Sequence, residues 1–486
     1  MPAPGFRLRV LAAAIAVPIV AGGTPATAEA GSAATIVVDA AHPGGRLPSD
    51  FVGLSFEMRE LGIGNLDPGK GNVAAMFTTL SRTGNVRISG NTLDRDTLWV
   101  PEGQQAPDPL PDWVADVVTP ADIQRLNRLL AVTGWRTEVG INLGRWDPAL
   151  GADQAAAMFA ILGHRLVAAE CGNEPDQWVG KGFRPAGYAY PDYHADWQAC
   201  AAAVGSNRIA GPDTAGTSSS WAASLAADER AKLSMLTVHQ YSAGPDATIA
   251  ALMAPGTVTR QLNSVSGNLA AARAQQLPMR IDEANSAFSG GVDGVSNKFA
   301  SALWVLDYTM SMAQAGLSGV NIHGGLGVCN EPIWNGKFQR YTPFCAASKA
   351  DELAQVYKAM PIYYGLWLAR RMGPGRFLPL STSTDRNITA YAVRGDDGRT
   401  RIAVLQKDDT NSTPVRLDIR LGGHAQHAEV LRLTGTSLAD EQTAIQGSTV
   451  DSRGRLRPHA DQVRVRNGVL SLDIPAGSAM MIAVNG

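Results

Sequence analysis

The sequence predicts an α/β fold, an eight-stranded (β/α)8 barrel followed by a smaller all-β sandwich. Two observations carry this prediction. From Phe51 to about Arg371, eight short apolar runs alternate with longer segments of helical periodicity. After Gly373 the pattern changes to strict alternation of apolar and polar residues between turn signals, which is typical of an all-β module.

The predicted barrel strands are short runs rich in aliphatic residues. In chain order they are 51–56, 85–88, 137–142, 166–169, 208–210, 236–239, 279–282 and 320–322. Helical periodicity predicts intervening helices that include 121–133, 151–162, 192–204, 296–315 and 352–371. A doubly wound open sheet is the competing fold. It would need a glycine-rich phosphate turn after its first strand, and Gly53-Leu54-Ser55 is not one.

The second module is predicted from alternation and turns. Segments 387–394 and 400–406 alternate around a turn at 396–398, and Asn467-Gly468 is a strong hairpin signal between 463–466 and 469–474. Residues 34–39 form an extra predicted strand ahead of the barrel. The expected parts are a signal peptide at 1–28, an N-terminal strand at 29–46 that joins the sandwich, the barrel at 47–372 and the sandwich at 373–486.

The first thirty residues have the pattern of a secretory signal peptide. Arg7 and Arg9 precede an apolar stretch over 10–23, and Ala26-Thr27-Ala28 offers small residues for cleavage. The stretch is too short for a membrane-spanning helix, which needs about 20 apolar residues. We therefore expect an exported protein, extracellular or periplasmic, with no membrane attachment after cleavage.

The charge balance excludes some classes of partner. The 42 Lys and Arg nearly cancel the 44 Asp and Glu, and the net charge is −2. With 45% hydrophobic and 18% charged residues, the chain is neither disordered nor built for nucleic acid. We expect a monomer with no nucleic-acid partner.

The four cysteines are compatible with export. A disulfide between Cys329 and Cys345 would constrain the long loop between them. For Cys171 and Cys200, a bridge and two buried thiols are both open. None of the spacings resembles a zinc site.

Two strand ends carry conspicuous carboxylates. The fourth strand leads into Glu174 and the seventh into Glu283. Strands four and seven face each other across a barrel mouth, where the active sites of such barrels lie. Two carboxyl groups about 5–5.5 Å apart are the machinery of a retaining glycosidase, one as nucleophile and one as acid and then base. Asn173, beside Glu174, is placed to hydrogen-bond a sugar 2-hydroxyl. We expect a raised pKa for the acid and an ionised nucleophile.

These motifs resemble glycoside hydrolase family 79, which holds microbial β-glucuronidases and the heparanases. The resemblance rests on Gly-Asn-Glu-Pro-Asp at 172–176 and on Asp-Glu-Ala-Asn-Ser at 282–286, followed by Gly290-Gly291. Segments 51–57 and 87–91 and the order of barrel and sandwich are also similar. The resemblance implies that Glu174 is the acid/base and Glu283 the nucleophile, and that neither a metal nor an organic cofactor is needed.

Several further residues are candidates for the sugar pocket. Tyr241 resembles the family tyrosine that contacts the nucleophile, and Asn321 and His323 end the eighth strand. Glu57 either binds a sugar hydroxyl or pairs with Arg87. We interpret His239 as a hydrogen-bonded core histidine, and Lys181, Arg184 and Lys298 as solvated surface charges.

The loop after Glu283 bears on the identity of the sugar. The resemblance implies that backbone N–H groups at Gly290 and Gly291 and a tyrosine hydroxyl hold the uronate carboxylate. Phe288 stands where the family usually has that tyrosine, and phenylalanine donates no hydrogen bond. Tyr341 or another loop residue is then needed to substitute for it.

The preferred hypothesis is a secreted retaining hydrolase of β-D-glucuronides that acts on small glucuronides or chain ends. A second enzyme hypothesis keeps both Glu residues and changes the sugar to another β-glycoside or an arabinofuranoside. A third is a non-catalytic carbohydrate-binding protein on the same scaffold.

Overall fold

The computed structural model describes residues 33–334, 336–421 and 425–485, so the predicted signal peptide at 1–28 lies outside the described residues. Eight parallel strands close a barrel in the order β10-β11-β12-β3-β4-β7-β8-β9. They are β3 (Val52–Glu57), β4 (Asn85–Ser89), β7 (Arg136–Ile141), β8 (Leu166–Cys171), β9 (Ile209–Thr214), β10 (Leu233–Tyr241), β11 (Met279–Asn285) and β12 (Gly319–Gly324). Each overlaps one of the predicted runs, so the predicted barrel is confirmed.

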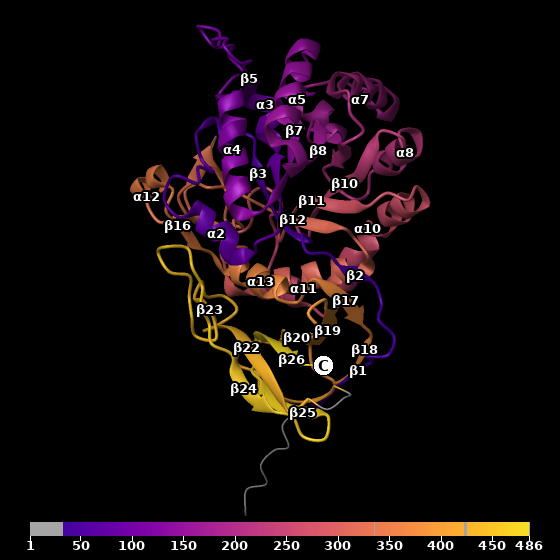
Figure 1. Ribbon diagram of the computed structural model, residues 1–486, viewed down its shortest axis with the longest axis vertical. Helices are drawn as coiled ribbons and strands as arrows, with labels where there is room; N and C mark the ends of the chain where they lie inside the picture. The colour runs from indigo at the N-terminus through magenta and orange to yellow at the C-terminus, as the bar shows by residue number, and fades with distance from the viewer. Residues whose placement is uncertain (1–32, 335, 422–424, 486) are drawn as a thin grey trace, which may run out of the picture. The chain divides into compact units, whose positions relative to one another are not determined.

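Helices surround the barrel strands (Figure 1). The longer ones are α4 (Pro120–Thr133), α5 (Pro148–Leu162), α7 (Tyr190–Val204), α8 (Trp221–Asp228), α10 (Thr257–Ala274), α11 (Phe299–Ala315) and α13 (Pro361–Arg370). Shorter helices are α1 (Arg59–Gly62), α2 (Val73–Leu80), α3 (Asn91–Asp96), α6 (Trp178–Lys181), α9 (Ile249–Met253) and α12 (Lys349–Ala354). Local sequence fixes their ends: α4 begins at a capping box of Thr119 and Asp122 and stops at Gly134, whose φ is 79°.

The predicted helix at 352–371 is wrong in its first half. Helix α12 ends at Ala354, and Gln355 takes a left-handed conformation with φ 55°. The chain then forms β16 (Tyr357–Ala359), which pairs with β15 (Phe344–Ala346), before α13 begins at Pro361. A proline lacks the N–H that a helix interior needs but suits the first turn, so the helical pattern had to restart there.

The C-terminal module is a sandwich of two sheets. One has the order β18-β1-β21-β25 and contains β1 (Ala33–Val38), β18 (Leu380–Ser383), β21 (Val415–Arg420) and β25 (Val469–Ile474). The other has the order β2-β17-β19-β20-β26-β22-β23, with β24 beside β22. Its strands are β2 (Arg46–Leu47), β17 (Gly375–Leu378), β19 (Ile388–Gly395), β20 (Thr400–Gln406), β22 (His427–Gly435), β23 (Thr443–Ile445), β24 (Asp461–Arg464) and β26 (Ser478–Val484). Aliphatic side chains of the two sheets form one core between them.

The strand β1 lies inside the smaller sheet. It pairs antiparallel with β18 and parallel with β21, so a segment from before the barrel is hydrogen-bonded on both sides to strands that follow it. Alternate residues of β1, including Ile36, point into the sandwich core. The smaller sheet therefore depends on residues at both ends of the described chain.

The Asn467-Gly468 turn forms, but its flanking strands separate. Asn467 and Gly468 have φ of 50° and 73°, as a two-residue turn requires, and Arg466 bridges Val469. Beyond that bridge, β24 pairs with β22 in the larger sheet and β25 pairs with β21 in the smaller one. The turn links the two sheets, and the predicted two-stranded hairpin is wrong.

Buried polar contacts join the barrel helices to the sandwich. Asp307 on α11 accepts hydrogen bonds of 2.6 Å from the Tyr391 hydroxyl and from Lys407 Nζ.

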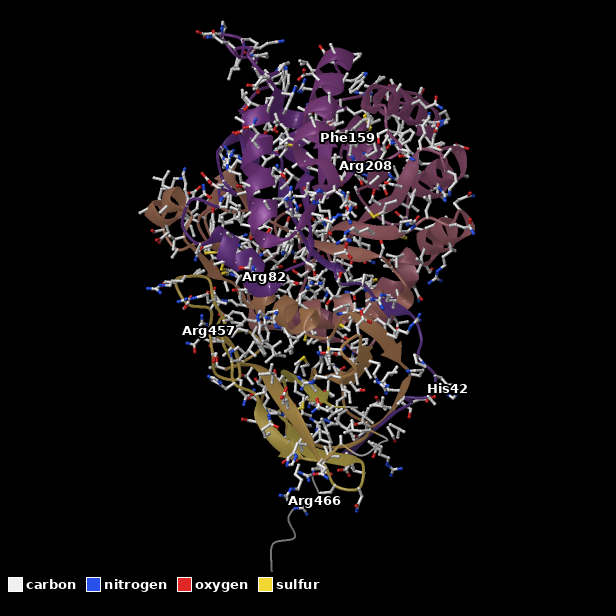
Figure 2. The ribbon with its side chains drawn as sticks, in the orientation of Figure 1. His42, Arg82, Phe159, Arg208, Arg457 and Arg466 are labelled. Atoms are coloured by element: carbon white, nitrogen blue, oxygen red, sulfur yellow. A yellow bond between two sulfur atoms is a disulfide. The ribbon has the colours of Figure 1, made fainter. Side chains whose placement is uncertain are left out.

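Further out on the barrel, the Arg208 guanidinium lies 4.7 Å from the centre of the Phe159 ring (Figure 2). Among the described residues, no helix has the length and apolar character that crossing a membrane requires.

Both cysteine pairs are bonded. Cys171 at the end of β8 is linked to Cys200 on α7, and Cys329 to Cys345 on β15. The first bond ties the strand that leads into Glu174 to the helix packed against it.

The remaining short strands are β5 (Thr97–Trp99), β6 (Asp116–Val118), β13 (Pro332–Trp334) and β14 (Lys337–Phe338).

Candidate active site

A cavity of about 770 Å³ opens at the carboxyl ends of the barrel strands. It is lined by Glu57, Asn91, Arg95, Glu174, Asp176, Gln177, Lys181, residues 215–218, Gln240, Tyr241, Ser264, Glu283, residues 288–290, His323, Phe338, Gln339 and Tyr341. Both predicted catalytic carboxylates therefore face one cavity. Its size suits a sugar ring and part of a leaving group.

The backbone presents Glu174 in an unusual conformation. Its φ and ψ are 51° and 56°, in the left-handed region that non-glycine residues seldom adopt. Its N–H donates to the carbonyl of Asp213 at the end of β9, and Pro175 begins a 3-10 turn directly after it. This strained turn aims the carboxylate at the cavity, and strain of this kind is concentrated at functional sites.

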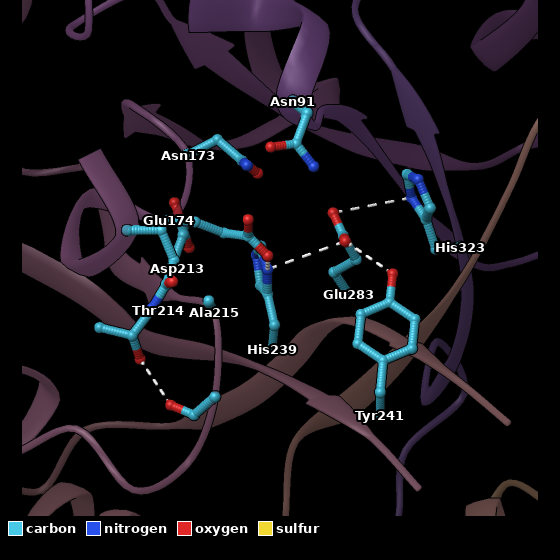
Figure 3. A network of polar contacts seen from close by, with 12 residues as sticks. Asn91, Asn173, Glu174, Asp213, Thr214, Ala215, His239, Tyr241, Glu283 and His323 are labelled. Atoms are coloured by element: carbon cyan, nitrogen blue, oxygen red, sulfur yellow. Dashed lines mark hydrogen bonds and ion pairs between the residues drawn. The ribbon is translucent and has the colours of Figure 1, made fainter. Parts of the chain in front are cut away.

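The two carboxylates come close to each other over His239. One carboxylate oxygen of Glu174, one of Glu283 and a ring nitrogen of His239 all lie within 4.8 Å of one another (Figure 3). His239 Nδ1 lies 3.1 Å from Oε1 of Glu174 and 3.8 Å from Oε1 of Glu283. The separation fits two carboxyl groups that act on the same bond from opposite faces of a sugar.

Glu283 is surrounded by donors. Its Oε1 accepts a hydrogen bond of 2.7 Å from the Tyr241 hydroxyl, and its Oε2 accepts one of 2.8 Å from Arg87 Nη1. His323 Nδ1 lies 3.7 Å from Oε2. Burial opposes ionisation of Glu283, but His323, His239 and Arg87 outweigh it and hold its pKa far below the ordinary value. The carboxylate expected of a nucleophile is present.

The expectation of a raised pKa at Glu174 is wrong for the free enzyme. Burial acts to raise the pKa, but the ammonium of Lys181 and the His239 ring outweigh it and lower the pKa to about 2. Lys181 Nζ lies 2.6 Å from Oε2 of Glu174. The pKa of Glu174 is thus lowered by one partner at the cavity wall, Lys181, and by one buried partner, His239.

Arg87 is the hub of the interior below the two carboxylates. This fully buried guanidinium contacts Glu283, Glu170 and Asp282 at 2.8–2.9 Å, and its Nη2 donates to Oδ1 of Asn173 at 3.0 Å. Burial, reinforced by the neighbouring Asp213, raises the pKa of both Glu170 and Asp282 well above the carboxyl range. One guanidinium cannot balance so many carboxylates, so these deeper ones hold protons.

Two groups of side chains have the donor types of a metal site. They are Glu174, His239 and Glu283, and Asp213, His239 and Asp282, each with ligand atoms within 4.8 Å of one another. Cations already occupy these neighbourhoods, since Lys181 lies 2.6 Å from Glu174 and Arg87 lies 2.9 Å from Asp282. Like charges at that range disfavour a metal ion in either group.

Asn173 and Tyr241 lie beside the catalytic pair. The Nδ2 of Asn173 is buried and has no hydrogen-bond partner among the described residues. Asn173 is 1% exposed and is not among the residues that line the cavity, so its predicted contact with a sugar hydroxyl stays a prediction. Tyr241 lines the cavity and contacts Glu283, as the motif predicts.

The loop after β11 turns through three left-handed residues. Ser289, Gly290 and Gly291 have φ of 59°, 85° and 84°, and a side chain at Gly290 would collide with the Phe338 carbonyl at 1.7 Å. The N–H groups of 289–291 have no hydrogen-bond partner among the described residues. Phe288 is 47% exposed at the cavity edge, and Gly291 packs on Ser296 and Tyr341 rather than lining the cavity.

Tyr341 brings a hydroxyl to the same part of the cavity. It lines the cavity, and its ring centre lies 6.0 Å from those of Tyr241 and His323. Burial raises the pKa of Tyr341 above its ordinary value, so the hydroxyl stays a donor.

Of the predicted site residues, Glu57 lines the cavity and Asn321 does not. Of the two alternatives for Glu57, the pair with Arg87 is not seen among the described residues, and Oε2 accepts from the Thr92 N–H and hydroxyl at 2.8 and 2.9 Å. Asn321 is outside the cavity, where its Oδ1 accepts from Arg280 Nε at 2.6 Å and its Nδ2 donates to Asn85. His323, two residues later on the same face of β12, is the one that reaches the cavity.

Sequence reasoning missed two participants. His239 is fully buried, as a core residue would be, yet it lies between the catalytic carboxylates (Figure 3). Lys181 contacts Glu174 instead of being a solvated charge. Lys298 pairs with Glu441 of the sandwich at 3.3 Å and is not part of the cavity lining.

The sandwich matches a known domain family. Residues 390–481 match the family profile described as "Glycosyl hydrolase family 79 C-terminal beta domain". A curated β-glucuronidase of Aspergillus niger is 25% identical over 393 residues, covering 68% of each chain. A β-glucuronidase of Neurospora crassa is 24% identical over 304 residues, covering 53% of this chain and 51% of that one.

Solved structures match the fold over nearly the whole chain. A 4-O-α-L-rhamnosyl-β-D-glucuronidase from Fusarium oxysporum superposes with a TM-score of 0.76 at 20% identity, covering 92% of this chain and 99% of that one. A family 51 arabinofuranosidase from Xanthomonas axonopodis pv. citri gives 0.68 at 15% identity, covering 93% and 100%. At these identities the likeness shows the fold. Together these matches confirm the resemblance to glycosyl hydrolase family 79 and establish that the chain is a glycoside hydrolase.

Proposed function

We propose that this glycoside hydrolase cleaves β-D-glucuronides by a retaining, double-displacement mechanism. The observation that carries the proposal is the approach of Glu174 and Glu283 oxygens to within 4.8 Å at the carboxyl ends of β8 and β11, which lie three strands apart in the barrel. In this mechanism Glu283 attacks the anomeric carbon while Glu174 protonates the leaving oxygen. Glu174 then takes a proton from the water that releases the sugar.

The surroundings of each carboxylate support these roles. Glu283 is held ionised by His323, His239 and Arg87. When Glu283 becomes a glycosyl ester its charge is lost, and Arg87 keeps its contacts to Glu170 and Asp282. Glu174 lies where an approaching leaving group meets both Lys181 and the buried His239.

The cavity wall supports a uronic acid as the glycon. The N–H groups of Ser289 and Gly290 and the hydroxyl of Tyr341 are donors at the cavity wall that a carboxylate accepts from. In this proposal Tyr341 replaces the hydroxyl that Phe288 lacks. The curated relatives named as β-glucuronidases support the same sugar.

A different glycon is the second candidate. The exposed Phe288 at the cavity edge removes one donor from the loop, which favours neutral sugars more than a tyrosine would. The arabinofuranosidase fold likeness is compatible with this alternative. A non-catalytic sugar-binding protein would have no use for a strained Glu174 beside an ionised Glu283.

The test is hydrolysis of 4-nitrophenyl β-D-glucuronide beside the matching β-glucoside, β-xyloside and α-L-arabinofuranoside, with Glu283→Ala as the control. We expect glucuronide turnover that vanishes in the variant, and an anomeric product of retained configuration by NMR. Turnover of a neutral sugar instead would reject the glucuronide proposal and leave the mechanism intact. Full activity of Glu283→Ala would reject the mechanism.

We also propose that the enzyme is exported after removal of residues 1–28 and acts as a monomer. The basic, apolar and small-residue order of the leader supports export. The sandwich braces the barrel in this proposal, supported by the buried contacts of Asp307 with Tyr391 and Lys407. Mass spectrometry of the secreted protein and its sedimentation would test the cleavage site and the oligomeric state.

A further inference from the structure

Lys181 forms an ion pair with Oε2 of Glu174 at the cavity wall. It ends the single-turn helix α6, which is anchored by the buried Trp178 and its hydrogen bond of 3.0 Å to the Asn173 carbonyl. The Nζ of Lys181 lies 2.6 Å from Oε2 of Glu174 and 2.5 Å from Oδ1 of Asn91. Its side chain is 27% exposed and lines the cavity, so it is reachable from solvent and by a ligand.

This contact conflicts with the proposed role of Glu174. The Oε1 of Glu174 lies against His239, which is fully buried, so a leaving oxygen has to approach at Oε2. There it meets the ammonium of Lys181. Glu174 can carry a proton toward the leaving group only after Nζ has moved away, because the ion pair favours the ionised carboxylate.

The leaving group itself can draw Lys181 away. A hydrogen bond between an ammonium and an anion is roughly twice as strong as one to a neutral oxygen. A hydrogen bond from Nζ to a neutral leaving group is therefore weaker than the one it already makes to the Glu174 carboxylate. A hydrogen bond to a carboxylate or sulfate on the leaving group is about as strong as the one to Glu174. Other charged groups on this wall are already engaged. Arg95 contacts Asp96 at 3.1 Å, and Asp176 accepts a hydrogen bond of 2.9 Å from the Ala215 N–H.

We propose that the leaving-group side of the cavity takes an anionic group, a sugar or aryl ring bearing a carboxylate or sulfate, and that Lys181 binds this anion. In binding it, Lys181 leaves Oε2 of Glu174 to the scissile oxygen. The inference rests on the proposed function of Glu174 as the acid. It replaces the sequence-based interpretation of Lys181 as a solvated charge with a role in selecting the substrate.

The test compares two aryl glycosides that differ only in one ring substituent, a carboxylate or its carboxamide, with rates corrected for the pKa of the phenol. Wild-type enzyme should favour the carboxylate roughly tenfold in kcat/KM, as one charge-assisted contact predicts. Lys181→Met should abolish the preference by slowing the anionic substrate much more than the carboxamide. Lys181→Arg should keep the preference to within about threefold, since it keeps the charge.

Lys298→Met is the matched control, because Lys298 is paired with Glu441 and lies outside the cavity lining. Its ratio of kcat/KM for the carboxylate substrate to kcat/KM for the carboxamide should equal that of wild type. No preference in wild type, or an equal loss on both substrates in Lys181→Met, overturns the proposal. The latter would mean that Lys181 only supports Glu174. The substrate pair is built on whichever glycon the panel shows to be cleaved, so failure of the glucuronide proposal is seen separately.

Discussion

The hydroxyl of Tyr241 donates a hydrogen bond of 2.7 Å to Oε1 of Glu283 and so joins the end of β10 to the end of β11. Burial, with the charge of Glu283, raises the pKa of Tyr241 well above its ordinary value. The phenol therefore remains a donor throughout the neutral range. It holds one oxygen of Glu283, the proposed nucleophile, and Arg87 donates to the other oxygen at 2.8 Å.

Removal of that donor should slow the reaction without unfolding the protein. We expect Tyr241→Phe to lower kcat by roughly 10- to 100-fold, because one aligned donor near a reacting oxygen is worth about this much or more. The ring and its packing against Tyr341 are retained. Steady-state kinetics and a thermal melt would be compared, and an unchanged kcat would show that Tyr241 does not orient Glu283.

Loss of the acid should depend on the leaving group. Glu174→Ala should hydrolyse dinitrophenyl glycosides far better than alkyl glycosides, because a good leaving group departs without a proton. Added azide should take the place of water and give a glycosyl azide of retained configuration, identified by NMR. An equal loss on both leaving groups would exclude Glu174 as the acid.

Tyr341 and Phe288 should set the preference for a uronate. Tyr341→Phe removes a hydroxyl from the wall that we propose to bind the carboxylate, so the ratio of glucuronide to glucoside kcat/KM should fall roughly tenfold or more. Phe288→Tyr adds a hydroxyl at the edge of the same loop and should raise that ratio. If both variants keep the wild-type ratio, the carboxylate is bound elsewhere.

Arg87 should be a large contributor to stability. Arg87→Met leaves the ionised Glu283 buried without its cation and removes the contacts of Arg87 with Glu170 and Asp282, and loss of one partner from a buried ion pair costs about 3–5 kcal/mol. The exposed pair of Arg416 and Asp473 is the control, and Arg416→Met should cost less than about 1 kcal/mol. Denaturant unfolding measures the free energy of unfolding of both variants. Equal losses of free energy would mean that the buried contacts of Arg87 contribute no more to stability than an exposed ion pair.

Asp282 should make stability depend on pH in a definite direction. Burial raises its pKa in the folded state, so the native protein keeps a proton that the unfolded chain releases above about pH 4. The wild type therefore loses stability as pH rises from there toward the folded pKa, by at most about 1.4 kcal/mol per pH unit. Asn does not titrate, so the stability of Asp282→Asn relative to wild type should increase from pH 4 to 8. A constant difference in the free energy of unfolding would mean that Asp282 is ionised in the native state.

Much of the fold follows from the sequence because each barrel strand is buried on both faces. Such strands appear as apolar runs, and the Asn-Glu-Pro motif after the fourth points to Glu174 when it is taken together with a second Glu after the seventh. How deep an inward-pointing side chain lies inside the barrel, in contrast, does not follow from these runs. Asn321 and His323 both point inward from β12, and the stagger of eight strands decides that only His323 reaches the cavity.

The contact between Lys181 and Glu174 was equally out of reach of sequence patterns. It depends on a left-handed Glu174, a 3-10 turn and a four-residue helix in succession, none of which has a periodicity. The place of His239 between Glu174 and Glu283 was not predicted for another reason, since a buried histidine in a strand pattern suggests the core. Only the arrangement of β8, β10 and β11 around one axis shows that the core at this point is the active site.

The position of β1 between β18 and β21 has a consequence for synthesis of the protein. Residues 33–38 are made before the barrel, yet both of their hydrogen-bonded neighbours follow more than 340 residues later, after the entire barrel. The smaller sheet can close only when translation is almost complete, and closing so long a loop is slow. A fragment that begins at Gly373 would expose the strand edges of β18 and β21 that β1 covers, together with the edge of β17 that β2 covers, and should aggregate, whereas supplying residues 33–47 as a separate peptide should restore its solubility.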